Sequence, residues 1–350
     1  MSFEAFQHGH FRKPAEEAER KSLFKSSVSN VIVEITSRCN RVCSYCPIST
    51  VDRKSNNTLL NEDIFAKLID DLVSIDYSES ICLNLYNEPM ADRETLITRI
   101  KHIRDKLPKA RIYFSTNGDF LTKDYLREAV DAGLSELYVS IHAPAGKPYD
   151  DAYAITRFTE LARRIDKPIK IDAVRPGETV QGHARQFGIM INVFATNYYS
   201  LGSNRGESVS LNQQDFVRRS PCDRPFHDIT ISYEGTLFPC CQMFVDLKQH
   251  KDLYSVGNIA DFATIFDAYA SNKMAGWRKS LLTFGPKETP CASCTEGCRA
   301  ETPENVASRE AVYRDMIGEL PPAAVEEATT SIEPGILARI ARRLQIRARP

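Results

Sequence analysis

The 350-residue chain contains no apolar run long enough to cross a bilayer, and within residues 1–28 no apolar stretch follows a basic segment. A secretory signal needs an apolar stretch behind a basic segment, so this beginning predicts neither a signal peptide nor a membrane span. The net charge of −1 gives no electrostatic reason to expect nucleic acid as a partner. We therefore expect a cytoplasmic globular protein, whose 42% hydrophobic residues suffice for a sizeable core.

Cysteine is the informative residue type, with ten present. Without a secretory signal, this number indicates metal or redox use in a reducing compartment rather than disulfides. Three of them form Cys39-Asn-Arg-Val-Cys43-Ser-Tyr-Cys46, directly after the apolar run 31–35. Three thiolates hold three irons of a [4Fe–4S] cube and leave the fourth iron open. Structural zinc is the alternative, although it usually has four ligands in paired form, and no histidine lies nearby.

A strand followed by a C-x3-C-x2-C loop resembles the radical S-adenosylmethionine (radical SAM) superfamily, which also places an aromatic residue, here Tyr45, before the third cysteine. The resemblance implies that Cys39, Cys43 and Cys46 bind a [4Fe–4S] cluster whose open iron chelates S-adenosyl-L-methionine. In that superfamily the reduced cluster cleaves SAM to a 5′-deoxyadenosyl radical, which abstracts a hydrogen atom from the substrate. The resemblance also implies an external reductant such as flavodoxin or ferredoxin.

Strand-like and helix-like segments alternate from residue 30 onward. The expected strands are 31–36, 80–86, 111–115, 136–142, 168–174 and 189–195. The expected helices are 61–75, 93–106, 122–132 and 151–165, with Thr122 as an N-cap and Gly133 at a C-terminal cap. Repeated β–α units with crossovers predict a parallel sheet, and six units are too few for an eight-fold barrel. The fold class is therefore α/β, with the partial (β/α)6 barrel that the resemblance implies.

Composition divides the chain into four segments. These are a polar N-terminal extension (1–29), the radical SAM core (30–214), a cysteine-rich auxiliary domain (215–302), and a linker with a C-terminal helix (303–350). In the last segment, residues 335–347 place isoleucine and leucine on one helical stripe with arginines around it. Such a basic helix either packs in solvent on the body or makes contact with a membrane surface.

Polar residues follow several expected strands. The sequence Asn87-Glu88-Pro89 resembles the Gly-Gly-Glu-Pro motif of the superfamily, which implies that Glu88, beside Asn87, receives the methionine ammonium of SAM. By the same resemblance, Ser140 is the candidate for contact with the SAM ribose or carboxylate, and His142 either faces the substrate or is structural. Further strand-end candidates are Asp172, Arg175, Asn192 and Asn197, and the turn Thr116-Asn117-Gly118 supports the fold.

A second cysteine set lies in the auxiliary domain. Cys222, Gly235 and Cys240 form a C-x12-G-x4-C element, which is followed by Cys291-Ala-Ser-Cys294. This pattern resembles the SPASM/twitch auxiliary-cluster domain, and Tyr-Glu-Gly235 predicts a hairpin turn that brings Cys240 back toward Cys222. The resemblance implies one auxiliary [4Fe–4S] cluster on Cys222, Cys240, Cys291 and Cys294. A four-cysteine zinc site is the alternative.

Three cysteines remain. Cys82 is expected to be a buried strand residue, whereas Cys241 or Cys298 is either an alternative ligand or a hydrogen donor to a substrate radical. We predict an oxidoreductase that dehydrogenates a small polyol, aminocyclitol, sugar or nucleoside in natural-product metabolism, with the auxiliary cluster taking the second electron. The alternatives are a radical epimerase of a sugar or peptide, a peptide-modifying enzyme, and a non-enzymatic iron–sulfur or zinc scaffold. A peptide substrate is disfavoured because residues 1–29 leave no room for a leader-binding domain.

Overall fold

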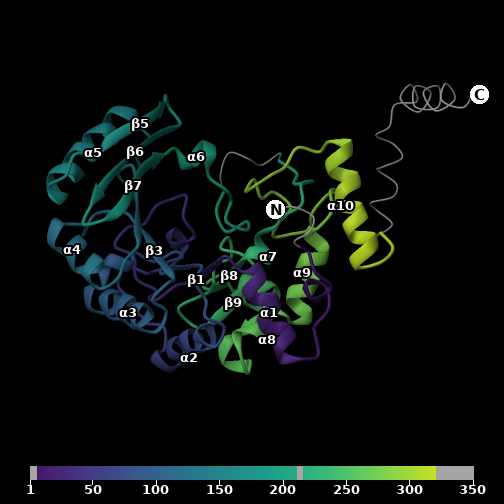
Figure 1. Cartoon of the computed structure of the whole chain (residues 1–350). Helices are drawn as coiled ribbons and strands as arrows, with labels where there is room; N and C mark the ends of the chain where they lie inside the picture. The colour runs from purple at the N-terminus through teal and green to yellow at the C-terminus, as the bar shows by residue number, and fades with distance from the viewer. Residues whose placement is uncertain (1–5, 211–215, 321–350) are drawn as a thin grey trace, which may run out of the picture.

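A single ten-stranded sheet runs through the computed structural model, which describes residues 6–210 and 216–320 (Figure 1). The strand order is β10-β9-β8-β1-β2-β3-β4-β7-β6-β5. The strands are β1 (Asn30–Val33), β2 (Ser80–Cys82), β3 (Arg111–Thr116), β4 (Glu136–Ile141), β5 (Lys170–Arg175), β6 (Thr179–Gln186), β7 (Ile189–Thr196), β8 (Asp228–Ile231), β9 (Thr236–Phe238) and β10 (Gly257–Asn258). The auxiliary domain therefore shares one sheet with the core.

Six neighbouring strands of this sheet are parallel, in the order β8-β1-β2-β3-β4-β7. The parallel core and its α/β class were predicted, but the expected fifth unit was wrong. The segment 168–174 forms the edge strand β5, which pairs antiparallel with β6, and β6 pairs antiparallel with β7. The turn between β5 and β6 is too short for a crossover helix, so only antiparallel pairing is available. The sixth parallel strand is β8, which comes from the auxiliary domain.

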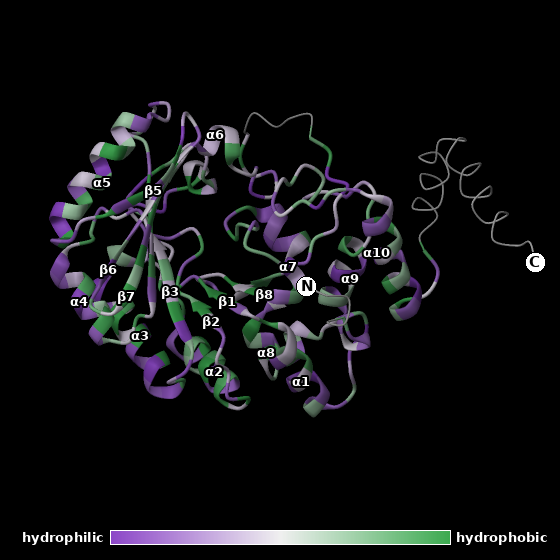
Figure 2. Ribbon diagram, turned by 45° about the horizontal axis from the view of Figure 1, so that its top comes forward, coloured by the Kyte–Doolittle hydropathy of each residue, from purple (hydrophilic) through white to green (hydrophobic). Residues whose placement is uncertain are grey.

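Four helices lie along the outer side of the core strands, as Figure 1 shows. They are α2 (Glu62–Val73), α3 (Arg93–Lys106), α4 (Lys123–Asp131) and α5 (Asp151–Ile165), close to the expected ranges. Each begins at a side chain that accepts hydrogen bonds from free backbone N–H groups, namely Asn61, Asp92, Thr122 and Asp150. Their apolar stripes and one face of the parallel strands form the main core, and Figure 2 shows β1 and β2 largely in the green of hydrophobic residues. The alternate residues of these strands face the other way, toward a cavity.

The described part of the N-terminal segment, from residue 6, packs on the folded body. Helix α1 (Glu17–Ser27) packs on α8 (Ile265–Tyr269) with Phe24 buried. Phe6 and Phe11 join a separate cluster with Phe226 of the short helix α7 (Arg224–His227). A few large rings bury much apolar surface each, so they attach the segment despite its many polar residues.

The C-terminal part of the described chain contains α9 (Asn272–Leu281) and α10 (Pro303–Met316), while α6 (Tyr198–Leu201) follows β7. Helix α10 occupies the start of the segment predicted as a linker. The expected basic helix at 335–347 lies outside the described residues. Within residues 6–210 and 216–320, no helix is long and apolar enough to cross a membrane.

Candidate active site

The three-cysteine loop begins a few residues after β1, at the carboxyl edge of the parallel strands. The backbone N–H of Cys39 donates to the carbonyl of Arg53 over 3.0 Å. Arg41 donates two hydrogen bonds to the carboxylate of Asp119, at 2.7 and 2.6 Å. Asp119 follows β3, so this bidentate pair fixes the loop, which follows β1, to a strand end two positions away in the sheet.

Cys39, Cys43 and Cys46 all line one cavity of about 340 Å³, which we call the central cavity. Its other main lining residues are Tyr45, Cys82, Tyr86, Asn87, Glu88, Ser140, His142, Tyr198, Arg205 and Cys241. Burial raises the pKa of the Cys39 thiol to about 12 and that of Cys46 to about 11. Without metal these thiols stay protonated at pH 7. Iron binding displaces their protons, so the three cysteines are suited to bind a cluster.

Asn87 supplies a free donor on the wall of the central cavity. Its Oδ1 accepts a hydrogen bond from the backbone N–H of Leu85 at 3.1 Å, whereas its buried Nδ2 has no partner among the described residues. An orphaned buried donor is costly unless a ligand satisfies it. The carboxylate of a bound amino acid has the matching chemistry, so the cavity fits SAM at this point.

Glu88 connects the ends of two strands. Its carboxylate accepts hydrogen bonds from Thr116 Oγ1 at 2.6 Å and from the backbone N–H groups of Asn117 and Met90 at 2.6 and 3.0 Å. Burial raises the pKa of Glu88 to about 7 despite these bonds. Glu88 lines the central cavity, and its contact with the ammonium of SAM stays a prediction. Its structural role at the β2–β3 junction was not predicted.

Three half-buried rings stack on one side of the central cavity. Tyr45, His142 and Tyr198 all contact one another, with centroid distances of 4.9 Å for Tyr45–Tyr198 and 5.8 Å for each of the other two pairs, and with interplanar angles of 26–28°. The Tyr45 hydroxyl and His142 Nδ1 are 2.8 Å apart, and the Ser140 and Tyr198 hydroxyls are 3.0 Å apart. Burial lowers the pKa of His142 to about 4, so its ring is neutral at pH 7.

Arg205 was not predicted, although it lines the central cavity together with Tyr86, Cys46, Cys241 and Tyr198. It forms no ion pair with any residue of 6–210 or 216–320. Its φ of 51° lies in the left-handed region that is uncommon for a non-glycine residue, and Ser208 Oγ donates to its carbonyl at 2.7 Å. Such backbone conformations cluster at functional sites. No periodic signal marked it, because it lies in an irregular loop rather than at a strand end.

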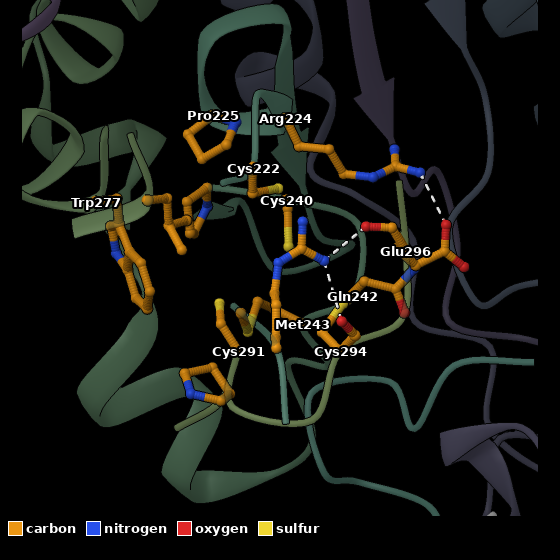
Figure 3. Close-up of a pocket in the computed structure, with 14 residues that line it drawn as sticks. Cys222, Arg224, Pro225, Cys240, Gln242, Met243, Trp277, Cys291, Cys294 and Glu296 are labelled. Atoms are coloured by element: carbon orange, nitrogen blue, oxygen red, sulfur yellow. Dashed lines mark hydrogen bonds and ion pairs between the residues drawn. The ribbon is translucent and has the colours of Figure 1, made fainter. Parts of the chain in front are cut away.

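The four predicted auxiliary ligands line a second, mainly apolar cavity, shown in Figure 3 and called the auxiliary cavity. These residues are Cys222, Cys240, Cys291 and Cys294. The predicted hairpin is present as β8 and β9, joined by a turn with Gly235 at φ 80°. Each thiol has its pKa raised first by burial, and the charges of the neighbouring thiols raise that of Cys240 further.

Arg218 is a buried cation of the auxiliary cavity. It donates to the carbonyls of Cys294 and Glu296 at 3.0 and 2.6 Å, and to the carbonyl of Pro221 at 2.7 Å. It has no carboxylate partner in the described part of the chain. Since a cluster with four thiolates is anionic, this uncompensated guanidinium matches the charge of the group that the cysteines are expected to bind.

Cys240 and Cys241 are consecutive residues that line different cavities, the auxiliary cavity and the central cavity respectively. Tyr86 donates its hydroxyl to the carbonyl of Cys241 at 3.0 Å. Cys82 is buried on β2, as expected, and also lines the central cavity. Cys298 is exposed, lines neither cavity, and has its Sγ 3.8 Å from the carbonyl of Cys294.

The remaining strand-end candidates do not line the central cavity. His183 Nδ1 and Asp172 Oδ2 are 2.6 Å apart on the edge hairpin, where Arg175 forms an ion pair with Glu178. Asn192 donates to Glu136, and Asn197 donates to the carbonyl of Gly177. Within the described ranges, no three His, Cys, Asp or Glu side chains meet at the distance of a single metal ion. In an iron–sulfur cube each thiolate binds a different iron.

Comparison with known protein families agrees with this geometry. The model of the radical SAM superfamily matches residues 33–170. The model of the SPASM iron–sulfur cluster-binding domain matches residues 222–295. The two matches coincide with the central and auxiliary cysteine sets.

Individual relatives give a closer comparison. The chain is 32% identical over 267 residues to the S-adenosyl-L-methionine-dependent 2-deoxy-scyllo-inosamine dehydrogenase of Niallia circulans, across 76% of this chain and 92% of that protein. It is 30% identical over 120 residues to the GTP 3′,8-cyclase of Nautilia profundicola, across 34% and 36% of the two chains. Among solved structures, BtrN in complex with AdoMet and 2-DOIA superposes with a TM-score of 0.55 at 23% identity, covering 79% of this chain and 96% of that one. This likeness confirms the expected fold class.

Proposed function

The chain belongs to the radical SAM superfamily and carries a SPASM-type iron–sulfur domain, and we propose that it oxidises an alcohol carbon of an aminocyclitol or a related cyclic polyol. It is a SAM-dependent oxidoreductase whose cofactors are SAM, a [4Fe–4S] cluster and an auxiliary iron–sulfur cluster. The substrate class rests on the relative from Niallia circulans, of which this chain covers 92%.

The observation that carries the proposal is the position of Cys240 and Cys241. One peptide unit joins a residue of the auxiliary cavity to a residue of the central cavity. Oxidation of an alcohol requires two electrons to leave the substrate, the first within the hydrogen atom. A second redox group next to the central cavity suits the acceptance of the other electron.

SAM and the cluster held by Cys39, Cys43 and Cys46 would supply the radical that removes the hydrogen atom, and an auxiliary cluster held by Cys222, Cys240, Cys291 and Cys294 would supply an acceptor for the second electron. The chain's own residues position the substrate and accept the proton that its hydroxyl group releases. Arg205 offers several N–H donors to a substrate oxygen and, as a cation, favours deprotonation of the hydroxyl group. His142 lines the same cavity as a neutral ring and has a lone pair for the proton that the hydroxyl releases.

The experiment is anaerobic reconstitution followed by turnover of 2-deoxy-scyllo-inosamine and other cyclic polyols with SAM. We expect one 5′-deoxyadenosine per product and a product lighter by two hydrogens. Formation of 5′-deoxyadenosine without a lighter product from any polyol would contradict the substrate class. No 5′-deoxyadenosine at all would contradict the reaction type.

Radical epimerisation is the second candidate function, and Cys241 is the observation that favours it. Its thiol lines the central cavity, where it is placed to return a hydrogen atom to a substrate radical. An epimerase leaves the product mass unchanged in ordinary water and incorporates one deuterium from heavy water. The same turnover assay, repeated in heavy water, separates the two functions.

A further inference from the structure

A second hollow, of about 280 Å³, lies on the other side of the three-cysteine loop, and we call it the outer hollow. Cys43 is the one loop cysteine that lines both the outer hollow and the central cavity. The other lining residues are Asn40, Arg41, Val42, Ser44, Tyr45, Lys54, Ala143, Pro144, Ala145, Gly146, Lys147 and Tyr199. The loop that is expected to bind the cluster therefore separates the substrate side from an outward-facing surface.

The outer hollow is basic. Three of its lining residues, Arg41, Lys54 and Lys147, carry positive charge, and none of its lining residues is acidic. The charge of Arg41 is compensated by Asp119, so the two lysines supply the excess. Lys54 and Lys147 are exposed and form no ion pair with the described residues. The whole chain has a net charge of −1, so this local excess of positive charge is not a consequence of overall composition.

Arginines lie beyond the hollow along α5, where Arg157 forms an ion pair with Glu160. Asp119, which binds Arg41, lies 3.8 Å from the guanidinium of Arg157. Arg164 donates to the carbonyls of Asp119 and Gly118 at 3.0 and 2.7 Å. Val42, 52% exposed on the rim, adds an apolar contact of the kind found at the centre of protein interfaces.

We propose that the outer hollow is the docking site of an acidic one-electron carrier protein of the flavodoxin or ferredoxin type. The inference rests on the proposed function, because SAM cleavage requires the cluster to gain an electron. The docked carrier is oxidised by one electron, and the cluster beyond Cys43 is reduced by one. Complementary charge steers such an encounter and mainly raises the association rate.

The test compares two reductants on one variant. The double charge reversal Lys54→Glu/Lys147→Glu is measured for 5′-deoxyadenosine formation with pre-reduced flavodoxin and with dithionite. At low salt we expect the flavodoxin-driven rate to fall about tenfold or more, and the loss to shrink at high salt, because surface charges steer association and salt screens them. The dithionite-driven rate and the iron content should stay unchanged.

A matched control keeps the same change in net charge. Lys25→Glu/Lys101→Glu reverses two exposed lysines on α1 and α3 that form no ion pair with described residues, and it should keep the flavodoxin-driven rate. An equal loss in the control, or an unchanged flavodoxin rate in Lys54→Glu/Lys147→Glu, overturns the docking site. A parallel loss with dithionite overturns it too, since the hollow would then serve substrate entry or the cluster itself. Absence of dithionite-driven cleavage in the unmodified protein would instead contradict the proposed function.

Discussion

Arg53 and Glu34 form a buried ion pair, with 2.5 Å between Arg53 Nη1 and Glu34 Oε1 and with side chains 3% and 0% exposed. Arg53 also donates to Asp246 at 2.7 Å, and its guanidinium lies 4.6 Å from the ring centroid of Phe244. Glu34 accepts a hydrogen bond from the backbone N–H of Tyr86 at 3.1 Å. Arg53 and Glu34, together with their other contacts, therefore connect four parts of the chain. These are the end of β1, the segment after the three-cysteine loop, the end of β2 and the auxiliary domain.

Arg53→Met should strongly destabilise the protein. Removing one partner leaves Glu34 buried without its counter-charge, which lowers the free energy of unfolding by about 3–5 kcal/mol. The double variant Arg53→Met/Glu34→Gln should be less destabilised than the single variant. Urea unfolding followed by fluorescence measures the change.

Lys106→Met is the control for this pair, because it breaks an exposed ion pair with Asp70 whose side chains are 51% and 62% exposed. Its effect should be about 1 kcal/mol or less. Equal effects of Arg53→Met and Lys106→Met would show that burial does not govern the Arg53–Glu34 interaction.

Full reconstitution should give about eight irons per chain, since two four-iron clusters are expected from the two cysteine sets. The triple variant Cys39→Ala/Cys43→Ala/Cys46→Ala should retain about four irons by the same rule and form no 5′-deoxyadenosine. Iron analysis and chromatography measure both. SAM cleavage that persists in the triple variant contradicts the loop as the cluster site, and about four irons in the unmodified protein would indicate zinc or nothing in the auxiliary cavity.

Arg205→Met should weaken substrate use more than SAM binding. A hydrogen bond from a charged donor contributes about 1.5–3 kcal/mol, so kcat/KM for the polyol should fall roughly 10- to 160-fold. Arg205→Lys keeps the charge and should recover part of the loss. Steady-state kinetics and SAM titration separate the two effects; a loss confined to SAM affinity would place Arg205 against SAM instead of the substrate.

Cys241 and Cys298 should both be dispensable for hydrogen removal. We expect Cys298→Ala to turn over like the unmodified protein because Cys298 is exposed and lines neither cavity. Cys241→Ala should raise KM, since Cys241 forms part of the cavity wall, but should still yield the lighter product. Deuterium incorporation from heavy water, together with loss of turnover but not of SAM cleavage in Cys241→Ala, would identify Cys241 as a hydrogen donor.

His10 should make stability depend on pH. Burial lowers its pKa from 6.5 to about 3, and its Nε2 is 2.9 Å from Ser27 Oγ. As the pH falls from 6.5 toward 3, the unfolded chain binds a proton that the folded chain does not. The free energy of unfolding therefore decreases by up to about 1.4 kcal/mol per pH unit from this group.

The variant His10→Gln should lose this contribution and show a shallower dependence on pH in urea unfolding between pH 6.5 and 4. His8→Gln, which changes an exposed histidine two residues away, serves as the control for the loss of one titratable group. Parallel stability curves for His10→Gln and the unmodified protein would mean that His10 is protonated in the folded state.

Local patterns in the sequence were sufficient to predict which cysteines lie together. The spacing of the cysteines predicted two groups. Cys39, Cys43 and Cys46 line the central cavity, and the four auxiliary cysteines line the auxiliary cavity. Thr122 caps α4 as predicted, and the hairpin at Gly235 is present. These features depend on residues close together in the chain, where turn and capping chemistry act directly.

The missed features depend on contacts between distant segments. Strand β6 gave a weak strand signal because it contains Gly182, where a Cβ would lie 2.5 Å from the carbonyl of Lys170. All residues of β5 are exposed, so alternation did not reveal an edge strand. Arg205 and Arg53 acquire their roles from residues up to about two hundred positions away, such as Asp246, and no periodicity reports such pairings.

The parallel pairing of β8 with β1, from Asn30 opposite Asp228 to Val33 opposite Ile231, limits the modularity of the chain. A chain cut short before the auxiliary domain would leave β1 as a sheet edge with unpaired N–H and C=O groups, and exposed apolar edges promote aggregation. The radical SAM core consequently depends on the auxiliary domain to complete its sheet. Any natural or engineered shortening of this chain would have to replace a structural strand as well as a redox centre.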